Sequence, residues 1–256
     1  MPELGIVVAL VAAGGAYGLG VHRQWASRPT TGVAPAAAFF GGVAVLAIAL
    51  LSPLDGAAHR ALWVHMVQHV LLISVAAPLL AAGRPLAVAR VMWPWPPPAW
   101  RLGRWATVVA AAGIQVVTLL VWHIPALYEA ALAHDAIHGA EHVTLLATAV
   151  ALWLALVAVP GEQGGLAVVV LFLVSFPPLL LGAAMTFAST AWYPAYALPG
   201  RHALADQQLA GVVMWAYGGL AAVAGGVYLF VTWLRRLEAL SPGRPATAPI
   251  GGRPSC

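Results

Sequence analysis

Charged side chains are scarce in this 256-residue chain. Asp, Glu, Lys and Arg together make up 8% of the residues, against roughly a quarter in an ordinary soluble domain. Hydrophobic residues make up 62% of the chain, and the mean hydropathy is +0.87. This composition excludes a water-soluble fold and indicates that most of the chain faces lipid. Because no long polar segment remains for a second domain, we expect one membrane domain over residues 1–240.

Lysine is absent, so arginine supplies the whole basic excess. The arginines give the chain a net charge of +4 and a pI near 9.7, but they are spread over short loops. Scattered loop arginines are typical of membrane topology signals rather than of a phosphate-binding patch. We therefore expect no nucleic-acid partner.

Cysteine occurs once, as Cys256, the last residue. This excludes a disulfide framework, a CxxC redox pair and a thiolate metal site. A metal ion would have to be held by histidine, methionine, carboxylate or amide groups. The first apolar run is preceded by Glu3 rather than by Lys or Arg, which is not typical of a cleaved signal peptide, so we expect a retained helix.

The hydrophobic residues gather in seven runs, each long enough to cross roughly 30 Å of hydrocarbon. They lie at about residues 4–21, 34–52, 61–82, 105–123, 140–159, 165–188 and 207–233. The sequence therefore predicts an all-α integral membrane protein with a bundle of seven transmembrane helices. The Pro-, Gly- and Arg-containing residues 241–256 are predicted to form a disordered tail.

The arginines are distributed unevenly between the two sides of such a bundle. One side carries Arg23, Arg28, Arg84, Arg90, Arg101, Arg104, Arg235, Arg236, Arg244 and Arg253. The other side carries only Arg60 and Arg201. Because arginine-rich loops stay in the cytoplasm, this asymmetry predicts an outer N-terminus and a cytoplasmic C-terminus. The Trp- and Pro-rich residues 93–98 are expected to anchor the arginine-rich face at headgroup depth.

Histidines collect on the opposite, outward side. Eight of the nine fall in outward loops or at the outer ends of spans three, four and five; the exception is His22. His65 and His69 are four residues apart, which places both on one helix face about one turn from each other. His138 and His142 repeat this spacing, preceded by His134 and with Glu141 adjacent. Ionisable groups within membrane segments are expensive, so this gathering is treated as a candidate functional site.

Other polar and sulfur-bearing residues extend the candidate set. His123 closes span four, where Pro125 is expected to end that helix or begin a short one. Glu141 is placed to orient an imidazole or to bind metal itself, whereas Asp55 and Asp206 are read first as helix caps. The thioethers of Met66, Met185 and Met214 would favour Cu(I), although a methionine taken alone is more often simple packing.

Ordinary structural roles compete with metal binding at each position. The loop histidines His59, His134 and His202 are better explained as solvated or locally hydrogen-bonded groups. A single buried histidine such as His65 or His123 serves equally well as an interhelical hydrogen-bond partner. Several imidazoles at one depth, however, repel one another when protonated and satisfy one another poorly when neutral. A shared metal ion resolves that conflict.

The motifs resemble those of the CtaG family of multispanning cytochrome c oxidase assembly factors. The resemblance rests on blocks that occur in order over roughly residues 35–235: His65-Met66-Val67-Gln68-His69, Ala77-Pro78-Leu79-Leu80, Gly83-Arg84-Pro85, Trp122-His123-Ile124-Pro125-Ala126-Leu127-Tyr128, His138-Gly139-Ala140-Glu141-His142, Tyr193-Pro194-Ala195-Tyr196 and Asp206-Gln207-Gln208-Leu209-Ala210-Gly211-Val212-Val213-Met214-Trp215. His59, His134 and His202 lie outside these blocks.

The resemblance implies a seven-helix protein of the bacterial cytoplasmic membrane that supports maturation of a heme-copper oxidase by supplying copper. The expected partners are oxidase subunits and periplasmic copper donors. The candidate ligands and orienting groups are then His65, His69, His123, His138, Glu141, His142, Asp206 and Met214, with Gln68 and Gln207 in support. Gln207 and Met214 are seven residues apart, so both are expected on one face of span seven, packed beside spans three and five.

Three functions remain open at this point. The leading one is a non-enzymatic, copper-binding assembly factor. The second is a zinc-dependent membrane hydrolase, which would need a lipid-sized cavity and a general base near the metal-bound water. The third is a b-type heme protein, which fits poorly because histidine pairs one turn apart at a single depth favour a compact ion over a planar macrocycle.

Overall fold

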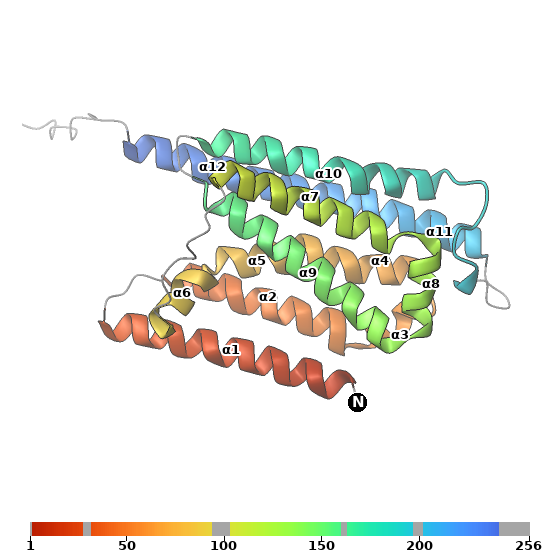
Figure 1. Ribbon diagram of the computed structural model, residues 1–256, viewed down its shortest axis with the longest axis horizontal. Helices are drawn as coiled ribbons and strands as arrows, with labels where there is room; N and C mark the ends of the chain where they lie inside the picture. Colours follow the sequence, from red (N-terminus) through yellow and green to blue (C-terminus); the bar gives the residue numbers. More distant parts are fainter. Residues whose placement is uncertain (1, 28–31, 94–102, 160–162, 197–201, 241–256) are drawn as a thin grey trace, which may run out of the picture.

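The computed structural model describes residues 2–27, 32–93, 103–159, 163–196 and 202–240, and every regular element within these ranges is helical (Figure 1). Seven helical segments are long and apolar enough to cross a membrane. They are Glu3–Ala26, Val33–Leu51, Leu62–Ala82, Arg104–Trp122, Asp135–Val157, Gly164–Thr186 and Ala203–Glu238. The prediction of an all-α membrane bundle with seven spans is confirmed.

Some spans are single helices and others are composite. The single ones are α1 (Pro2–Ser27), α2 (Val33–Leu51), α7 (Arg104–Trp122), α9 (Asp135–Val157) and α10 (Gly164–Thr186). The third span joins α4 (Leu62–Val70), the π-helical turn η1 (Leu71–Ala76) and α5 (Ala77–Ala82). The seventh joins α11 (Ala203–Val212), the π-helical turn η4 (Val213–Tyr217) and α12 (Gly218–Leu240). Shorter helices are α3 (Pro53–Ala58), α6 (Pro85–Met92), α8 (Pro125–Ala133) and the 3₁₀ turn η3 (Pro194–Tyr196).

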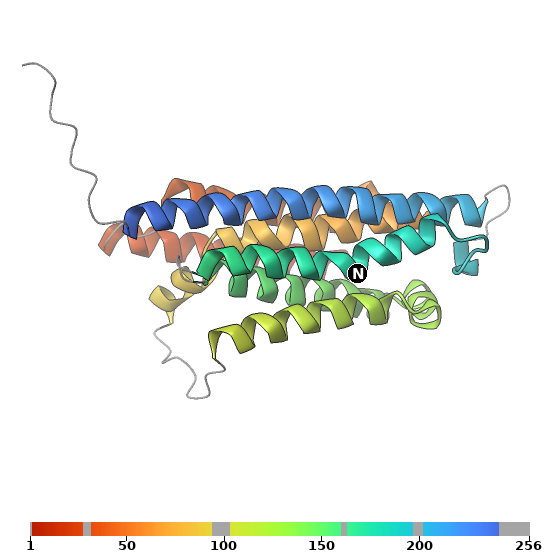
Figure 2. The same cartoon turned by 90° about the horizontal axis from the view of Figure 1, so that it is seen from above.

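The short helices mark the two ends of the bundle. The start of α1, the helices α3 and α8 and the start of α11 lie together at one end, which we call the site end (Figure 1). Helix α6 and the last turns of α12 lie at the other end, and the view from above agrees (Figure 2). Among the described arginines, only Arg60 lies at the site end. The opposite end carries Arg23, Arg84, Arg90, Arg104, Arg235 and Arg236.

The boundary of the fifth span differs from the sequence-based expectation. We predicted a start near residue 140, but α9 begins at Asp135, directly after the extended residue His134. The acidic side chain in the first turn favours this start because the helix N-terminus carries partial positive charge. All of His138, Glu141 and His142 are therefore helical, and their spacing places them on one face. The expected short helix after span four is confirmed, since α8 begins at Pro125.

Two predictions fall on residues that the structure does not describe. The proposed anchor at residues 93–98 lies outside the described residues except for Trp93, which is exposed just after α6. The proposed disordered tail, residues 241–256, lies outside them altogether.

Helices α10 and α11 cross at very close range near the site end. A Cβ atom added at Gly211 would collide with the carbonyl oxygen of Gly182 and with both the backbone and the hydroxyl of Thr186. Small residues allow such approaches in membrane bundles, where close van der Waals packing replaces the hydrophobic effect as the driving force. This crossing fixes α11, and with it the side chains that α11 contributes to the site end.

We expect Gly211→Ala to destabilise the bundle. The added methyl group has to push two backbones apart, and overpacking of this kind costs about 1–3 kcal/mol. A lower thermal unfolding temperature of the purified protein in detergent would reveal it. Gly226→Ala, in α12, is the matched control, because a Cβ atom added at Gly226 meets no described atom within 4 Å. Equal unfolding temperatures for the two variants would contradict the close crossing.

Candidate metal centre

Helices α4 and α9 bring the predicted histidines together at the site end. On α4, His65 and His69 lie one turn apart; on α9, His138, Glu141 and His142 share one face. All five side chains are buried. The two helices thus supply the two converging histidine faces that the i, i+4 spacings predicted.

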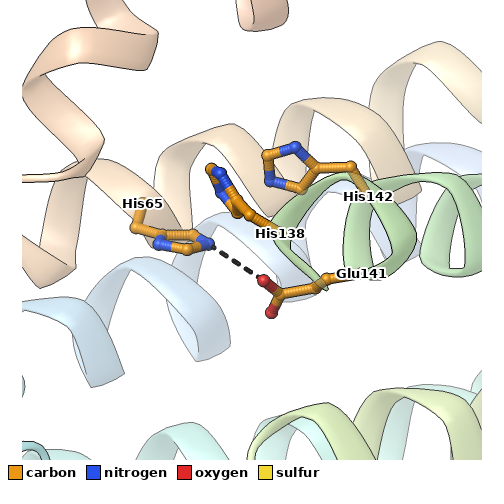
Figure 3. Close-up of side chains that lie close together, drawn as sticks. All are labelled: His65, His138, Glu141 and His142. Atoms are coloured by element: carbon orange, nitrogen blue, oxygen red, sulfur yellow. Dashed lines mark ion pairs between the residues drawn. The ribbon is translucent and has the colours of Figure 1, made fainter. Parts of the chain in front are cut away.

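Four of these residues form a compact group, which we call the four-residue group: His65, His138, Glu141 and His142 (Figure 3). One ligand atom from each lies within 4.8 Å of the ligand atoms of the other three. Nε2 of His65 is 3.8 Å from Oε2 of Glu141, and the imidazoles of His138 and His142 lie beside this pair (Figure 3). Three imidazole nitrogens and one carboxylate oxygen are a donor set that suits zinc or copper.

His69 adjoins the four-residue group without belonging to it. Its Nε2 atom is 2.9 Å from Nε2 of His65 and 3.5 Å from Oε1 of Glu141. Its Nδ1 atom points elsewhere, and among the described residues it has no hydrogen-bond partner. The sequence placed His65 and His69 as equivalent ligands, whereas the structure gives them different surroundings.

Several polar atoms of the group are buried without hydrogen bonds. Within the described part of the chain, Nε2 of His138, Nε2 of His142 and both carboxylate oxygens of Glu141 lack a partner. Glu141 is 0% exposed. Burying a polar group without a hydrogen bond costs free energy, and burying a carboxylate without a counter-charge costs considerably more. A metal cation at this position would supply the missing partner for all of these atoms at once, so the residues fit a metal site.

Hydrogen bonds fix the orientation of two further imidazoles. Nδ1 of His123 is 2.8 Å from the carbonyl oxygen of Leu119, and Nδ1 of His59 is 2.9 Å from that of Asp55. A carbonyl oxygen can only accept, so Nδ1 carries the proton in both rings. Each neutral ring then keeps the lone pair on Nε2, which is the form that binds a metal. Burial lowers the pKa of His123, which keeps that ring neutral.

Tyr196 orients His65 in the same sense. The Tyr196 hydroxyl donates to the carbonyl oxygen of Ala58 at 3.1 Å and lies 3.2 Å from Nδ1 of His65. Burial raises the pKa of Tyr196, so this hydroxyl keeps its single proton. With that proton engaged at Ala58, the hydroxyl oxygen accepts from Nδ1–H of His65. The lone pair of His65 is thereby left on Nε2, facing Glu141.

His123 and two of the candidate methionines lie near His69, outside the four-residue group. His123 follows the last turn of α7, and its ring centroid is 6.1 Å from that of His69. His69, His123, Met66 and Met214 all border one cavity of about 110 Å³. Met185 is fully buried in the same region but does not line this cavity. The structure therefore separates the predicted ligand set into two neighbouring parts.

The two aspartates serve other elements. The side chain of Ser52, not Asp55, caps α3, while Asp55 accepts a hydrogen bond of 2.7 Å from Gln68. Asp206 lies in the first turn of α11 but caps α4, accepting from the backbone N–H groups of Leu62 at 2.9 Å and Trp63 at 3.4 Å. The structure thus places Asp206 at the start of the helix that carries His65, outside the four-residue group.

The two supporting glutamines also join segments. Gln68 donates to the carbonyl oxygen of Ala49 at 2.9 Å, which ties α4 to α2. Gln207 accepts from the backbone of Trp192 and donates to the carbonyl oxygen of Thr190, which holds the segment before η3 against α11. Gln207 and Met214 are both buried. As expected, the seventh span packs beside the third, since α11 and η4 contact α4. Beyond Met214, the seventh span faces α9 across the cavity.

His59 was set aside in the sequence and lies next to the group. Its ring centroid is 5.0 Å from that of His138, and its side chain is exposed. No spacing rule relates it to α9, because helix α3 and its packing against α4 bring it there. His134 and His202, the other two loop histidines, are exposed at the starts of α9 and α11.

Three buried tyrosines at the site end were also missed. Tyr196 binds His65, Tyr128 lies with its ring centroid 5.1 Å from that of His65, and Tyr193 donates to the carbonyl oxygen of His123 at 2.9 Å. Their presence within the family-like blocks was the one sequence signal that pointed to them.

The fold and the site define a seven-helix membrane protein with a buried group of histidines and a glutamate suited to a metal ion. Comparison with protein families narrows this class: the family described as cytochrome c oxidase caa3 assembly factor (Caa3_CtaG) matches residues 15–236. The chain belongs to this family, as the sequence blocks predicted. No curated protein and no solved structure matches the chain.

We expect Asp206→Ala to weaken the start of α4. The variant leaves two backbone N–H groups at that helix start without their acceptor, and loss of a cap costs about 0.5–2 kcal/mol. The measurement is the thermal unfolding temperature of the metal-free protein. Asp206→Asn keeps an acceptor oxygen and should stay close to wild type. If both variants unfold at the same lowered temperature, the negative charge of Asp206 matters rather than the cap.

Proposed function

We propose that this chain is a non-enzymatic assembly factor that binds copper at the four-residue group and supports metallation of a heme-copper oxidase. The observation that carries the proposal is the convergence of three imidazoles and one carboxylate, all buried, with most of their ligand atoms unpartnered among the described residues. A cation offsets the cost of burying Glu141. The family supplies the context, since its members are assembly factors of cytochrome c oxidase.

The imidazole and thioether groups at and beside the four-residue group favour copper. Imidazole suits copper and zinc alike, but thioether groups favour copper in its Cu(I) state. Two methionines, Met66 and Met214, border the same cavity as His69, directly beside the group. The donor set contains no thiolate, so the site is expected to hold the ion loosely enough to release it. Release to another protein is what a copper donor requires.

The arginine asymmetry supports an outward-facing site. Six described arginines lie at the end opposite the four-residue group and one, Arg60, lies at the site end. Under the positive-inside rule, the arginine-rich end is cytoplasmic and the site end faces outward. In a bacterial cytoplasmic membrane, copper would then be received from a periplasmic donor and delivered to an oxidase subunit within the same membrane.

One observation favours the hydrolase alternative. The cavity of about 110 Å³ adjoins the candidate metal group and is lined mainly by apolar side chains, as a lipid-cleaving site would need. Glu141, however, lies within the four-residue group itself, where it serves as a ligand rather than as a separate general base. Metal identity separates the two functions, and a Soret band would indicate the heme alternative.

We expect purified wild-type protein to bind copper stoichiometrically after exposure to buffered copper. His65→Ala, His138→Ala and Glu141→Gln each remove one ligand, so copper content should fall sharply in all three. Elemental analysis by mass spectrometry gives the copper and zinc content per chain. His134→Ala is the control, since this exposed histidine begins the same helix as His138. Zinc in place of copper would support the hydrolase, and a metal-free wild type would refute the proposal.

We also expect His59 to receive the ion on its way in. Its exposed ring, held through Nδ1 at the carbonyl oxygen of Asp55, contacts buried His138 and so connects solvent to the four-residue group. His59→Ala should slow copper uptake severalfold in stopped-flow mixing with bicinchoninate-buffered Cu(I), while the final copper content stays unchanged. His202→Ala, which removes another exposed histidine from the site end, should load at the wild-type rate. Equal rates for all three proteins would exclude this role.

A further inference from the structure

The cavity beside the four-residue group runs from the site end toward the middle of the bundle. His69 and His123 border it near the site end, and Trp153 borders it deeper, about 16 Å further along α9 than His142. Both π-helical turns take part in its wall, through Ser74 of η1 and Met214 of η4. π turns are rare and occur frequently at functional sites, which makes this cavity a candidate for binding rather than a packing defect.

His123 borders this cavity and carries an unpartnered lone pair. Its Nδ1 proton is held by the carbonyl oxygen of Leu119, so its Nε2 atom has no proton to donate. That Nε2 atom is buried and has no partner in the described ranges. An acceptor of this kind needs either a hydrogen-bond donor or a metal ion.

His69 borders the same cavity and carries a second unpartnered lone pair. Because Nε2 of His65 carries no proton, the contact of 2.9 Å between the two Nε2 atoms requires His69 to be the donor. A neutral imidazole has one N–H group, so Nδ1 of His69 is a lone pair. Like Nε2 of His123, it is buried and lacks a partner among the residues the structure describes.

The donor groups around these two lone pairs are of the kind that favours soft metal ions. The ring centroids of His69 and His123 are 6.1 Å apart, and the methionines Met66 and Met214 border the same cavity. Nitrogen and thioether donors without a carboxylate favour Cu(I) over zinc or Cu(II). The four-residue group differs in containing Glu141, which accepts harder ions as well. The two parts of the ligand set therefore have different chemical preferences.

We propose that His69, His123, Met66 and Met214 form a second Cu(I) position, separate from the four-residue group and on its cavity side. The inference rests on the proposed copper function and adds a second step to it. His69 connects the two positions, since its Nε2 atom lies near His65 and Glu141 while the residue also borders the cavity and its Nδ1 atom has no described partner. When an ion engages the lone pair of His65, the Nε2–H of His69 has Oε1 of Glu141, 3.5 Å away, as its alternative acceptor.

The second position holds copper on the cavity side of the four-residue group. An ion that enters through the four-residue group moves past one imidazole ring to reach it. The ion travels as Cu(I) throughout, so no electron acceptor or donor is needed. Water is the competing occupant, because a cavity of about 110 Å³ is large enough to hold it.

The test counts copper ions in the full-length protein. Wild-type protein and variants are equilibrated anaerobically with bicinchoninate-buffered Cu(I), and copper per chain is measured by elemental mass spectrometry, with X-ray absorption to detect sulfur ligands. We expect two ions in wild type with a sulfur signal. His123→Ala should lose the ion of the second position and keep that of the four-residue group, whereas Glu141→Gln should lose the ion of the four-residue group and keep that of the second position. Met66→Leu and Met214→Leu conserve volume; each should weaken the sulfur signal and the double variant should lose it, which keeps the test valid if His123→Ala fails to fold.

Met185→Leu is the matched control, because Met185 is equally buried but does not line the cavity. It should keep both ions and the sulfur signal. A single ion in wild type that Glu141→Gln removes and His123→Ala and Met214→Leu leave unchanged would overturn the second position, with water as the occupant, and would leave the proposed function intact. A wild type without copper would overturn both.

Discussion

The site end is organised around one buried carboxylate. Glu141 lies inside the site end of a bundle whose outer surface is apolar; it is 0% exposed and, among the described residues, has no hydrogen bond. Burying a carboxylate in this way costs free energy, which a bound cation would offset. Histidines surround it from α4 and α9. Tyr196 orients His65, and backbone carbonyls orient the neighbouring His123 and His59. The neighbouring elements serve to keep this arrangement in register, including the cap that α11 provides for α4.

Much of this arrangement was accessible from local sequence patterns. Long apolar runs predicted all seven spans. The separation of four residues between His65 and His69, and between His138 and His142, predicted two facing histidine pairs. Periodicity suffices in these cases because residues four apart in an α-helix lie on the same face. The start of the fifth span moved from about residue 140 to Asp135, by less than two turns, and this brought more of the candidate residues into the helix.

What the sequence could not give were contacts between distant segments. Asp206 caps a helix that begins 144 residues earlier, and His59 reaches His138 through the placement of a six-residue helix. Nor does any spacing rule indicate which imidazole nitrogen carries the proton. That depends on single acceptors such as the carbonyl of Leu119 and the hydroxyl of Tyr196. These same contacts separate His69 and His123 from the four-residue group.

The two π-helical turns affect how this protein can change over time. Each turn accommodates an extra residue within a span, and one residue corresponds to about 100° of rotation around a helix axis. The half of the span next to the site and the half beyond it can therefore differ in their rotation around the helix axis. Substitutions that repack the far half of span three or span seven need not rotate His65, His69 or Gln207. A deletion of one residue within Leu71–Ala76 or Val213–Tyr217 would instead join the two halves into one continuous helix and turn one of them out of alignment.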